Sequence, residues 1–308
     1  MPPEAALPTF ADLQRGLRPS TPRAWRFAAL QAASRAGALV SDGLRIGYRH
    51  GFDSGPFMDH VYADTPTGRT ALGREIDRRL LRRRTCVAFR DIRGLAEQAV
   101  RDALAAAGSP APVVADLAAG PAPYLLAAVA AHPGAQAVLC DVDPAALDGA
   151  RAAAQRLGVR DRATFTRADA FDRAALAALD PKPDVVLELG LYGIYHDDAR
   201  IERHFADLAE LVSPGQIVFN VQTRNPEIEY IARVWVNAAG ERCVWRLRPV
   251  EQILGYAAAA GYAPASITAD RFGIYRVVRL VRASAEAASP PPTPGEGTQP
   301  QRRGTRWA

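Results

Sequence analysis

Cysteine is scarce in this chain of 308 residues. The three that occur, Cys86, Cys140 and Cys243, lie far apart, and no CxxC pair is present. Zinc sites and disulfide frameworks both need closely or regularly spaced cysteines, so we expect neither, and no bound metal of any kind. Without a disulfide framework, the reducing cytoplasm is the expected location.

Long hydrophobic runs are also missing. The N-terminal stretch up to Ser20 is rich in proline and has no apolar run of the kind found in signal peptides. No run of 18 uncharged apolar residues occurs elsewhere, and a transmembrane helix needs about that many. We therefore expect neither a signal peptide nor a transmembrane segment.

Lysine is almost absent, because Lys182 is the only lysine among 38 basic residues. The rest are arginines, and with the abundant alanine they are typical of GC-rich codon usage. The net charge of +5 is therefore weak evidence for a nucleic-acid partner, and we expect none. The densest basic stretch, Arg78–Arg84, is interpreted as a solvated helix face, with contact to nucleic acid or membrane as the alternative.

The composition divides the chain into four parts. Residues 1–20 and 284–308 are rich in proline and polar residues and are expected to be disordered. Residues 21–110 are predicted to form an N-terminal helical cap or lid, with helices over 21–38, 68–84 and 91–107. Residues 47–70 within it indicate loop and short helix. Residues 111–283 form the fourth part, which has a different pattern.

In residues 111–283, short β-branched runs alternate with alanine-rich helical stretches. Strands are predicted over 112–118, 135–140, 162–168, 183–190 and 216–222. Such βαβ repetition favours a parallel sheet with right-handed crossovers. Two more strands follow near residues 264–282, separated by little more than Asp270 and Arg271, and so tight a connection requires an antiparallel pair. The pattern predicts an α/β fold with a Rossmann-like, seven-stranded sheet closed by an antiparallel hairpin.

Two motifs at the ends of the first two strands indicate a nucleoside cofactor. Asp116–Pro123 follows the first strand, where Gly120 permits a tight turn that brings backbone amides close to a ligand. Ala118 and Ala122 stand at flanking positions of this turn. Asp141, followed by Val142, ends the second strand one helix after Gly120, where a carboxylate can accept both ribose hydroxyls. The alternative for Asp116 is a capping residue in an ordinary turn.

The next two strands end in further candidates. Asp169 and Ala170 follow the third strand, where an acid can accept the exocyclic amine of adenine, and a turn-forming aspartate is the alternative. Glu188 ends the fourth strand and is a further predicted cofactor-binding residue, and the loop after it carries Tyr192 and His196. Tyr192 and His196 are the predicted catalytic, acceptor-site residues. His196 is the candidate general base, with an ordinary loop histidine as the alternative.

Five segments carry a family resemblance: residues 47–70, 72–81, 113–126, 188–198 and 221–234. Over residues 25–282 the chain resembles class I S-adenosylmethionine-dependent methyltransferases, in particular a bacterial group sometimes fused to an α/β-hydrolase domain. The resemblance implies the class I sheet, S-adenosylmethionine as cofactor, and a cofactor-binding domain over 111–283. In such enzymes glycine is usual where Ala118 and Ala122 stand, although an Ala-Ala-Gly-Pro loop is normal in this group. No acceptor is implied.

The resemblance also concerns the segment before the first strand, which in class I methyltransferases folds over the cofactor. We therefore predict that Tyr62 and Arg74 line such a lid and bind the cofactor. Arg74 is the candidate to hold the carboxylate of the cofactor's methionine part, because a guanidinium can bind a carboxylate through two hydrogen bonds. The alternative is a helical cap held together by internal ion pairs.

Three functions are compatible with these motifs. The first is a methyltransferase for a small-molecule or lipid-related acceptor, favoured because a helical cap encloses a pocket. The second is an RNA or protein methyltransferase, and the third is a non-catalytic module that binds S-adenosylmethionine. Dehydrogenase chemistry with NAD is disfavoured by the terminal hairpin and by the missing GxGxxG motif. The residues do not indicate an oligomeric state.

Overall fold

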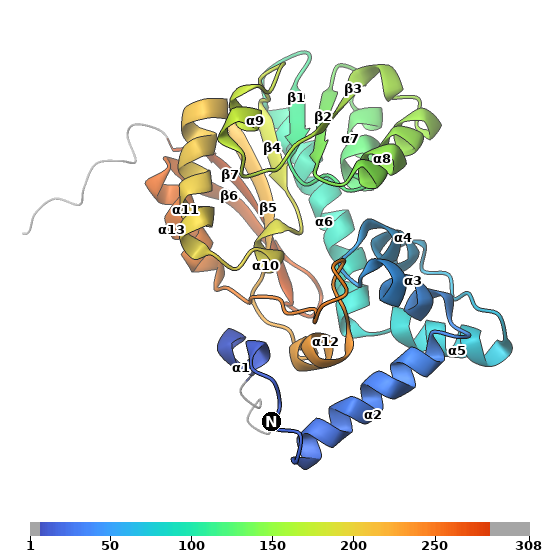
Figure 1. Cartoon of the computed structure of the whole chain (residues 1–308). Helices are drawn as coiled ribbons and strands as arrows, with labels where there is room; N and C mark the ends of the chain where they lie inside the picture. Colours follow the sequence, from blue (N-terminus) through green and yellow to red (C-terminus); the bar gives the residue numbers. More distant parts are fainter. Residues whose placement is uncertain (1–6, 284–308) are drawn as a thin grey trace, which may run out of the picture.

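The computed structural model of the protein describes residues 7–283. Seven strands form one sheet in the order β3-β2-β1-β4-β5-β7-β6, as Figure 1 shows. The predicted seven-stranded Rossmann-like sheet is thereby confirmed. The strands are β1 (Val113–Asp116), β2 (Gln136–Asp141), β3 (Ala163–Arg167), β4 (Val185–Glu188), β5 (Gln216–Gln222), β6 (Tyr262–Ala269) and β7 (Tyr275–Arg282).

The first five strands are parallel, so their carboxyl ends meet at one edge of the sheet. The helices that connect them are α7 (Pro123–Ala131), α8 (Pro144–Arg156), α9 (Arg173–Ala177) and, after β4, α10 (Leu191–Ile194) and α11 (Asp198–Asp207). The β6–β7 hairpin is antiparallel, as predicted, and β7 also pairs antiparallel with β5. In its turn the Asp270 carboxylate accepts hydrogen bonds from the amides of Phe272 and Tyr275.

Hydrophobic cores cover both faces of the sheet. On one face α7 and α8 pack with the long helix α6 (Arg84–Ala106), which also contacts β7. On the other face α11 packs with α13 (Val250–Ala259), and α13 also packs against β6. The five strands β1 to β5 thus lie in the middle layer of a three-layer structure, and open α/β sheets of this kind bind ligands at the carboxyl edge of their strands.

The cap is helical, as expected, and two of its helices lie within the ranges predicted over 21–38 and 68–84. It contains α2 (Pro22–Gly37), α3 (Asp42–His50), α4 (Gly55–Ala63) and α5 (Ala71–Leu81). The stretch 47–70, predicted as loop with short helix, includes the end of α3 and all of α4. Ser41 and Ser54 start them by accepting amide hydrogen bonds at the helix N-termini, a signal that the glycine-rich composition obscured.

Residues 21–110 do not form the cap alone, which corrects the predicted division of the chain. After β5 the chain returns to the cap as α12 (Ile228–Val234) and the segment up to Trp245. Trp235 stacks on Phe52 with ring centroids 4.7 Å apart, and Phe57 meets the same indole edge-on. The short cap helices have too little apolar surface to form a core by themselves, and α12 and the two tryptophans complete it. Helix α6, in contrast, packs mainly against α7 and the sheet rather than against the cap helices.

The expectation of disorder over residues 1–20 is wrong for part of that range. Helix α1 (Phe10–Gln14) begins with a capping box between Thr9 and Asp12, and Leu13 is buried. Arg233 and Arg242 donate to backbone carbonyls of residues 12–15 and hold the helix in place. Both arginines come from the far end of the chain, so the composition of the N-terminal stretch did not reveal them. Residues 1–6 and 284–308, also expected to be disordered, lie outside the described residues.

The basic stretch Arg78–Arg84 does not form one helix face. Helix α5 ends at Leu81 and α6 begins at Arg84, so the stretch spans a helix junction. Arg78 and Arg79 pair with Glu75, and Arg83 pairs with Glu227 at 3.2 Å. Several of its charges are thus neutralised within the cap. Among residues 7–283, no helix is long and apolar enough to cross a membrane.

Replacing Gly73 with Ala should destabilise the cap, because a Cβ there would lie 2.1 Å from the carbonyl oxygen of Val40. We expect a loss of about 1–3 kcal/mol of unfolding free energy, measured by chemical denaturation. Gly94 in the exposed part of α6 is the matched control, since its Cβ would meet nothing within 4 Å. Gly94→Ala should add about 0.5–1 kcal/mol. Equal effects of the two substitutions would contradict the close contact of α5 with Val40.

Candidate functional site

Asp116 is the last residue of β1, and its side chain is fully buried. The Tyr124 hydroxyl donates to one carboxylate oxygen at 2.8 Å, and the amide of Ala118 donates to the other at 3.2 Å. Burial raises the pKa of Asp116 to about 7, and the nearby Asp141 and Glu188 carboxylates add to this, while the two hydrogen bonds oppose it. Asp116 is therefore an acid whose ionised form lacks a cation among the described residues around it.

The loop after β1 turns tightly, as predicted. Gly120 has a φ of 53°, and its amide donates to the Asp141 carboxylate at 2.8 Å. Ala122, at the N-cap of α7, has a φ of 42°, although an alanine rarely adopts this left-handed conformation. The last turn is therefore as tight as one with glycine. Space is open above Gly120, where a Cβ would meet nothing within 4 Å.

Asp141 ends β2 and is half-buried beside this loop. One carboxylate oxygen accepts the Gly120 amide, and the other accepts the amide of Asp143 at 2.9 Å. The next side chain, Val142, is 57% exposed, so an apolar surface lies next to the carboxylate. The structure thus brings Asp116, Gly120, Asp141 and Val142 together, as the sequence predicted.

Asp169 and Ala170 follow β3 at the same edge. The Asp169 carboxylate accepts the Phe171 amide at 2.9 Å, which is the turn-forming arrangement considered as the alternative. Its other oxygen accepts a hydrogen bond from Arg200 at 3.2 Å. Arg200 also lies over the Phe171 ring, 4.5 Å from its centroid. Ala170 is buried. Asp169 therefore lies near its predicted place, but each of its carboxylate oxygens already accepts a hydrogen bond within the chain.

Glu188 ends β4 and is fully buried between two donors. The hydroxyl of Tyr192 and Nε2 of His204 both donate to its carboxylate. Tyr192 is itself fully buried, and burial raises its pKa well above the ordinary value. Tyr192 does not face open space, so the prediction that it lines the acceptor site is corrected. Its local signal, an aromatic after a strand end, reflects a core contact to Glu188.

His196, the second acceptor-site candidate, lies on the surface of the loop after α10. Its Nε2 is 2.9 Å from the carbonyl oxygen of Val244. A carbonyl only accepts, so Nε2 carries the proton and Nδ1 of the neutral ring is the acceptor. Burial is the main cause that lowers the His196 pKa, and Arg248 and Arg246 contribute. A neutral imidazole with a free Nδ1 is compatible with a base role.

The two lid candidates lie in different places. Tyr62 on α4 is partly buried and packs against the cap core, and burial raises its pKa to about 12. Arg74 is exposed on α5, which packs against α3 and α6. Figure 1 shows α5 at the outer end of the cap, away from the carboxyl ends of β1 to β4. The structure does not bring Arg74 to the other site residues.

Four residues that support the site were not identified from the sequence. Tyr124 holds Asp116, and His204 holds Glu188. The Asn220 side chain accepts the Gly190 amide at 2.7 Å, and buried Arg248 binds the carbonyl oxygens of Tyr192 and Tyr195. Each acts across strands or helices, on a partner outside its own element. For His204 and Arg248 the one available signal was a polar residue within an apolar stretch, and Tyr124 and Asn220 had no such signal.

The comparisons with known proteins agree with this geometry. A family model described as "Putative methyltransferase" matches residues 5–282. The protein YnbC of Escherichia coli K12, described as uncharacterized, is 34% identical over 271 residues, which is 84% of this chain. The chain spans 45% of YnbC, less than half of that relative's length.

Solved structures share the fold at low sequence identity. A possible exported protein from Bordetella parapertussis is 20% identical, with a TM-score of 0.63 over 86% of this chain and all of that one. The magnesium protoporphyrin IX methyltransferase of Synechocystis PCC 6803, solved with bound S-adenosylhomocysteine, is 19% identical, with a TM-score of 0.51 over 76% and 98% of the two chains. The chain therefore belongs to the methyltransferase family that matches residues 5–282, and its fold is that of the class I S-adenosylmethionine-dependent methyltransferases.

Proposed function

We propose that the chain transfers the methyl group of S-adenosylmethionine to a small-molecule or lipid-related acceptor. One observation carries the proposal: Asp116 and Asp141 end neighbouring parallel strands and flank the Gly120 turn. Open α/β sheets bind nucleosides in this arrangement, at the carboxyl edge of the strands. The family match supports the chemistry, and the cap beside this edge supports a small-molecule or lipid-related acceptor.

The residues present fit this cofactor. Asp116, buried and without a cationic partner in the described part of the chain, suits the ammonium of the methionine part. The open space above Gly120 suits close approach of the same part to backbone amides. The Asp141 carboxylate would accept the ribose hydroxyls, with Val142 and Ala170 beside the adenine. When bound, the cofactor supplies a methyl group activated by its sulfonium.

The chain's own contribution is alignment. Methyl transfer is an in-line displacement, so a rate gain comes from holding the acceptor atom behind the methyl group in a site that excludes water. Asn220 and Arg248 fix the loop from Gly190 to Tyr195, which borders this region. His196 is the nearest candidate base in that loop and would accept a proton at Nδ1. Tyr62 is proposed to line the cap side of the same space.

Titration of the purified chain with S-adenosylmethionine, S-adenosylhomocysteine and NADH tests the proposal. We expect binding of the first two and none of NADH. Asp141→Ala should weaken S-adenosylhomocysteine binding by at least about tenfold, because hydrogen bonds to a charged acceptor contribute about 1.5–3 kcal/mol. Asp148→Asn, an exposed carboxylate on α8, is the control and should change nothing. Tighter binding of NADH would overturn the proposed function.

A further inference from the structure

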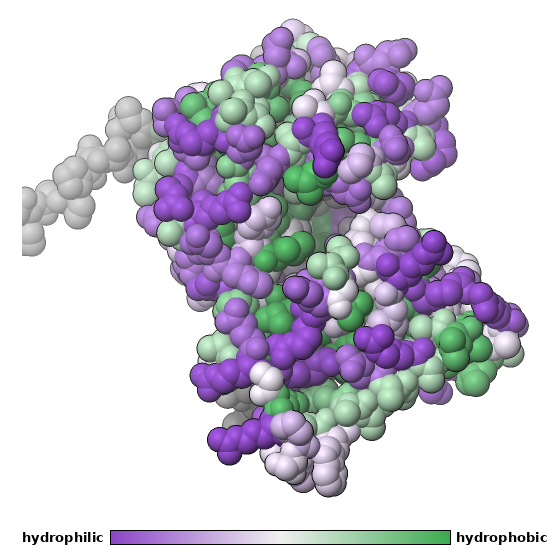
Figure 2. Space-filling model, viewed as in Figure 1, coloured by the Kyte–Doolittle hydropathy of each residue, from purple (hydrophilic) through white to green (hydrophobic). Residues whose placement is uncertain are grey.

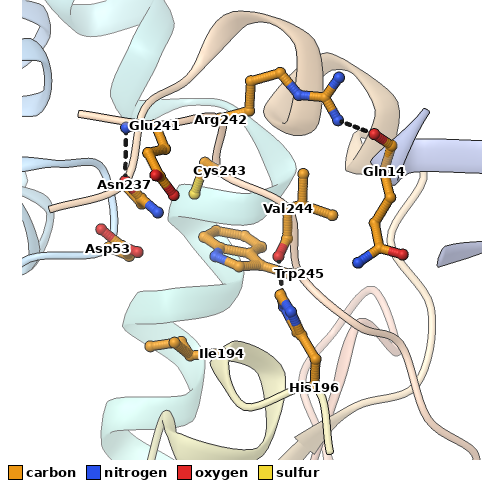
Figure 3. Close-up of a pocket in the computed structure, with 10 residues that line it drawn as sticks. All are labelled: Gln14, Asp53, Ile194, His196, Asn237, Glu241, Arg242, Cys243, Val244 and Trp245. Carbon is orange, nitrogen blue, oxygen red and sulfur yellow. Dashed lines mark hydrogen bonds between the residues drawn. The ribbon is translucent and has the colours of Figure 1, made fainter. Parts of the chain in front are cut away.

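A cavity of about 450 Å³ opens between the cap, the loop after α10 and the segment after α12, as Figure 3 shows. Its volume is within the range of about 300–1,000 Å³ that is typical of small-molecule sites. It is lined by Gln14, Asp53, Ile194, His196, Asn237, Glu241, Arg242, Cys243, Val244 and Trp245. None of these residues except His196 belongs to the site described above.

Two walls of the cavity also border the proposed cofactor site. Asp53 precedes Gly55 by two residues in the sequence. A Cβ added at Gly55 would lie 3.7 Å from Pro121, which belongs to the loop after β1. Ile194 and His196 follow β4 directly through α10. The surface is visibly hollowed between the sheet and the cap on the face seen in Figure 2. A molecule in the cavity would therefore be held next to the carboxyl ends of β1 and β4.

The polar part of the lining carries two carboxylates, Asp53 and Glu241, and one guanidinium, Arg242. One carboxylate oxygen of Asp53 is buried and accepts no hydrogen bond from the described residues, while the backbone of Ala238 contributes a hydrogen bond to the same carboxylate. Glu241 lies on the same side of Trp245 as Asp53 in Figure 3. The Arg242 guanidinium is occupied, because it donates to the backbone carbonyls of Leu13 and Gln14. Among the residues that line the cavity, the two carboxylates thus outnumber the one guanidinium, which is already bound to backbone carbonyls.

The rest of the lining is apolar or neutral. Ile194 is 47% exposed, and Val244 and the buried indole of Trp245 lie between the acidic side and His196. The neutral His196 ring forms the opposite side of the cavity, and its centroid lies 4.6 Å from the centroid of the Phe10 ring. An elongated ligand could place a cationic group at Asp53 and an apolar body along Ile194 and Val244.

We propose that this cavity is the acceptor site and takes a small molecule with a protonated amine, which the Asp53 carboxylate binds. The inference rests on the proposed function for its chemistry, but the amine contact stands on the cavity alone. An ammonium would donate a charge-assisted hydrogen bond to the Asp53 oxygen that has no donor among the described residues. A carboxylate or phosphate in the same place would face Asp53 and Glu241 and be repelled.

Three probes of one shape test the charge preference: phenethylamine, phenethyl alcohol and phenylacetate, each titrated at pH 7 into the full chain saturated with S-adenosylhomocysteine. Binding is followed by ligand-observed NMR. We expect phenethylamine to bind at least about tenfold more tightly than phenylacetate, since one charged hydrogen bond contributes about that factor. Asp53→Asn should weaken phenethylamine binding by about tenfold and leave phenethyl alcohol unchanged.

Folding and cofactor binding are controlled separately. Asp53→Asn should keep the wild-type affinity for S-adenosylhomocysteine, and Asp148→Asn should keep the wild-type affinity for all three probes. Equal binding of the three probes, binding of none, or an unchanged amine affinity in Asp53→Asn would overturn the inference while cofactor binding persists. If the wild-type chain does not bind S-adenosylhomocysteine, that result would instead count against the proposed function.

Discussion

His204→Ala is expected to lower the unfolding free energy by about 3–5 kcal/mol, because it removes a hydrogen-bond donor from a buried carboxylate and leaves a cavity in the core. His204 and Glu188 are both almost completely buried, and the imidazole is one of only two side-chain donors to that carboxylate in the described structure. Without it, Glu188 keeps the Tyr192 hydroxyl alone. Chemical denaturation at pH 7 measures the loss.

A double-mutant cycle separates the lost contact from the lost volume. Glu188→Gln replaces the carboxylate that His204 contacts, so adding His204→Ala to it should cost at least about 1 kcal/mol less than in the wild-type chain. His50→Ala is the matched control, because His50 is exposed at the end of α3 and should change stability by no more than about 0.5 kcal/mol. Additive effects of the two substitutions would show that His204 and Glu188 are not coupled.

The sheet could be predicted from the sequence because its signals are local. Each strand is a short β-branched run, and the tight connection around Asp270 already requires an antiparallel hairpin. Asp116 and Asp141 could be found for the same reason, since parallel strands place their carboxyl ends at one edge. Alanine in place of glycine at positions 118 and 122 does not prevent the turn, because Ala122 itself adopts the left-handed conformation.

The core of the cap and the surroundings of Tyr192 could not be predicted, because they depend on contacts between distant segments. Trp235, which follows the fifth strand, stacks on Phe52, which precedes the first, and no periodicity indicates such a partner. Tyr192 illustrates the opposite error. Its place after a strand end indicated an open site, but its hydroxyl is bound to a buried carboxylate. Whether an aromatic near a strand end faces ligand or core is decided by the side chain opposite it, here Glu188.

Asp116 is expected to lower stability and to support cofactor binding at the same time. Its pKa is raised from 3.8 to about 7 in the folded chain, mainly by burial. Between about pH 4 and pH 7 the folded state therefore binds more protons than the unfolded state, so this group's contribution to stability falls as the pH rises through that window. Asp116→Asn removes the ionisation, so the variant should be more stable than the wild-type chain at pH 8 and gain less at pH 5. Chemical denaturation at the two pH values checks this.

Cofactor binding should respond in the opposite direction. The ammonium of S-adenosylhomocysteine favours ionised Asp116, so wild-type affinity should rise with pH up to about 7 and level off above it. Asp116→Asn should bind about 100-fold more weakly at pH 8, because the ammonium then lies in a buried site without a counter-charge. Its affinity should also lose most of the pH dependence. Calorimetric titrations between pH 5.5 and pH 8.5 measure both effects. A wild-type affinity that is flat over this range, or an Asp116→Asn variant that binds as tightly as wild type, would mean that the methionine ammonium is held by another group.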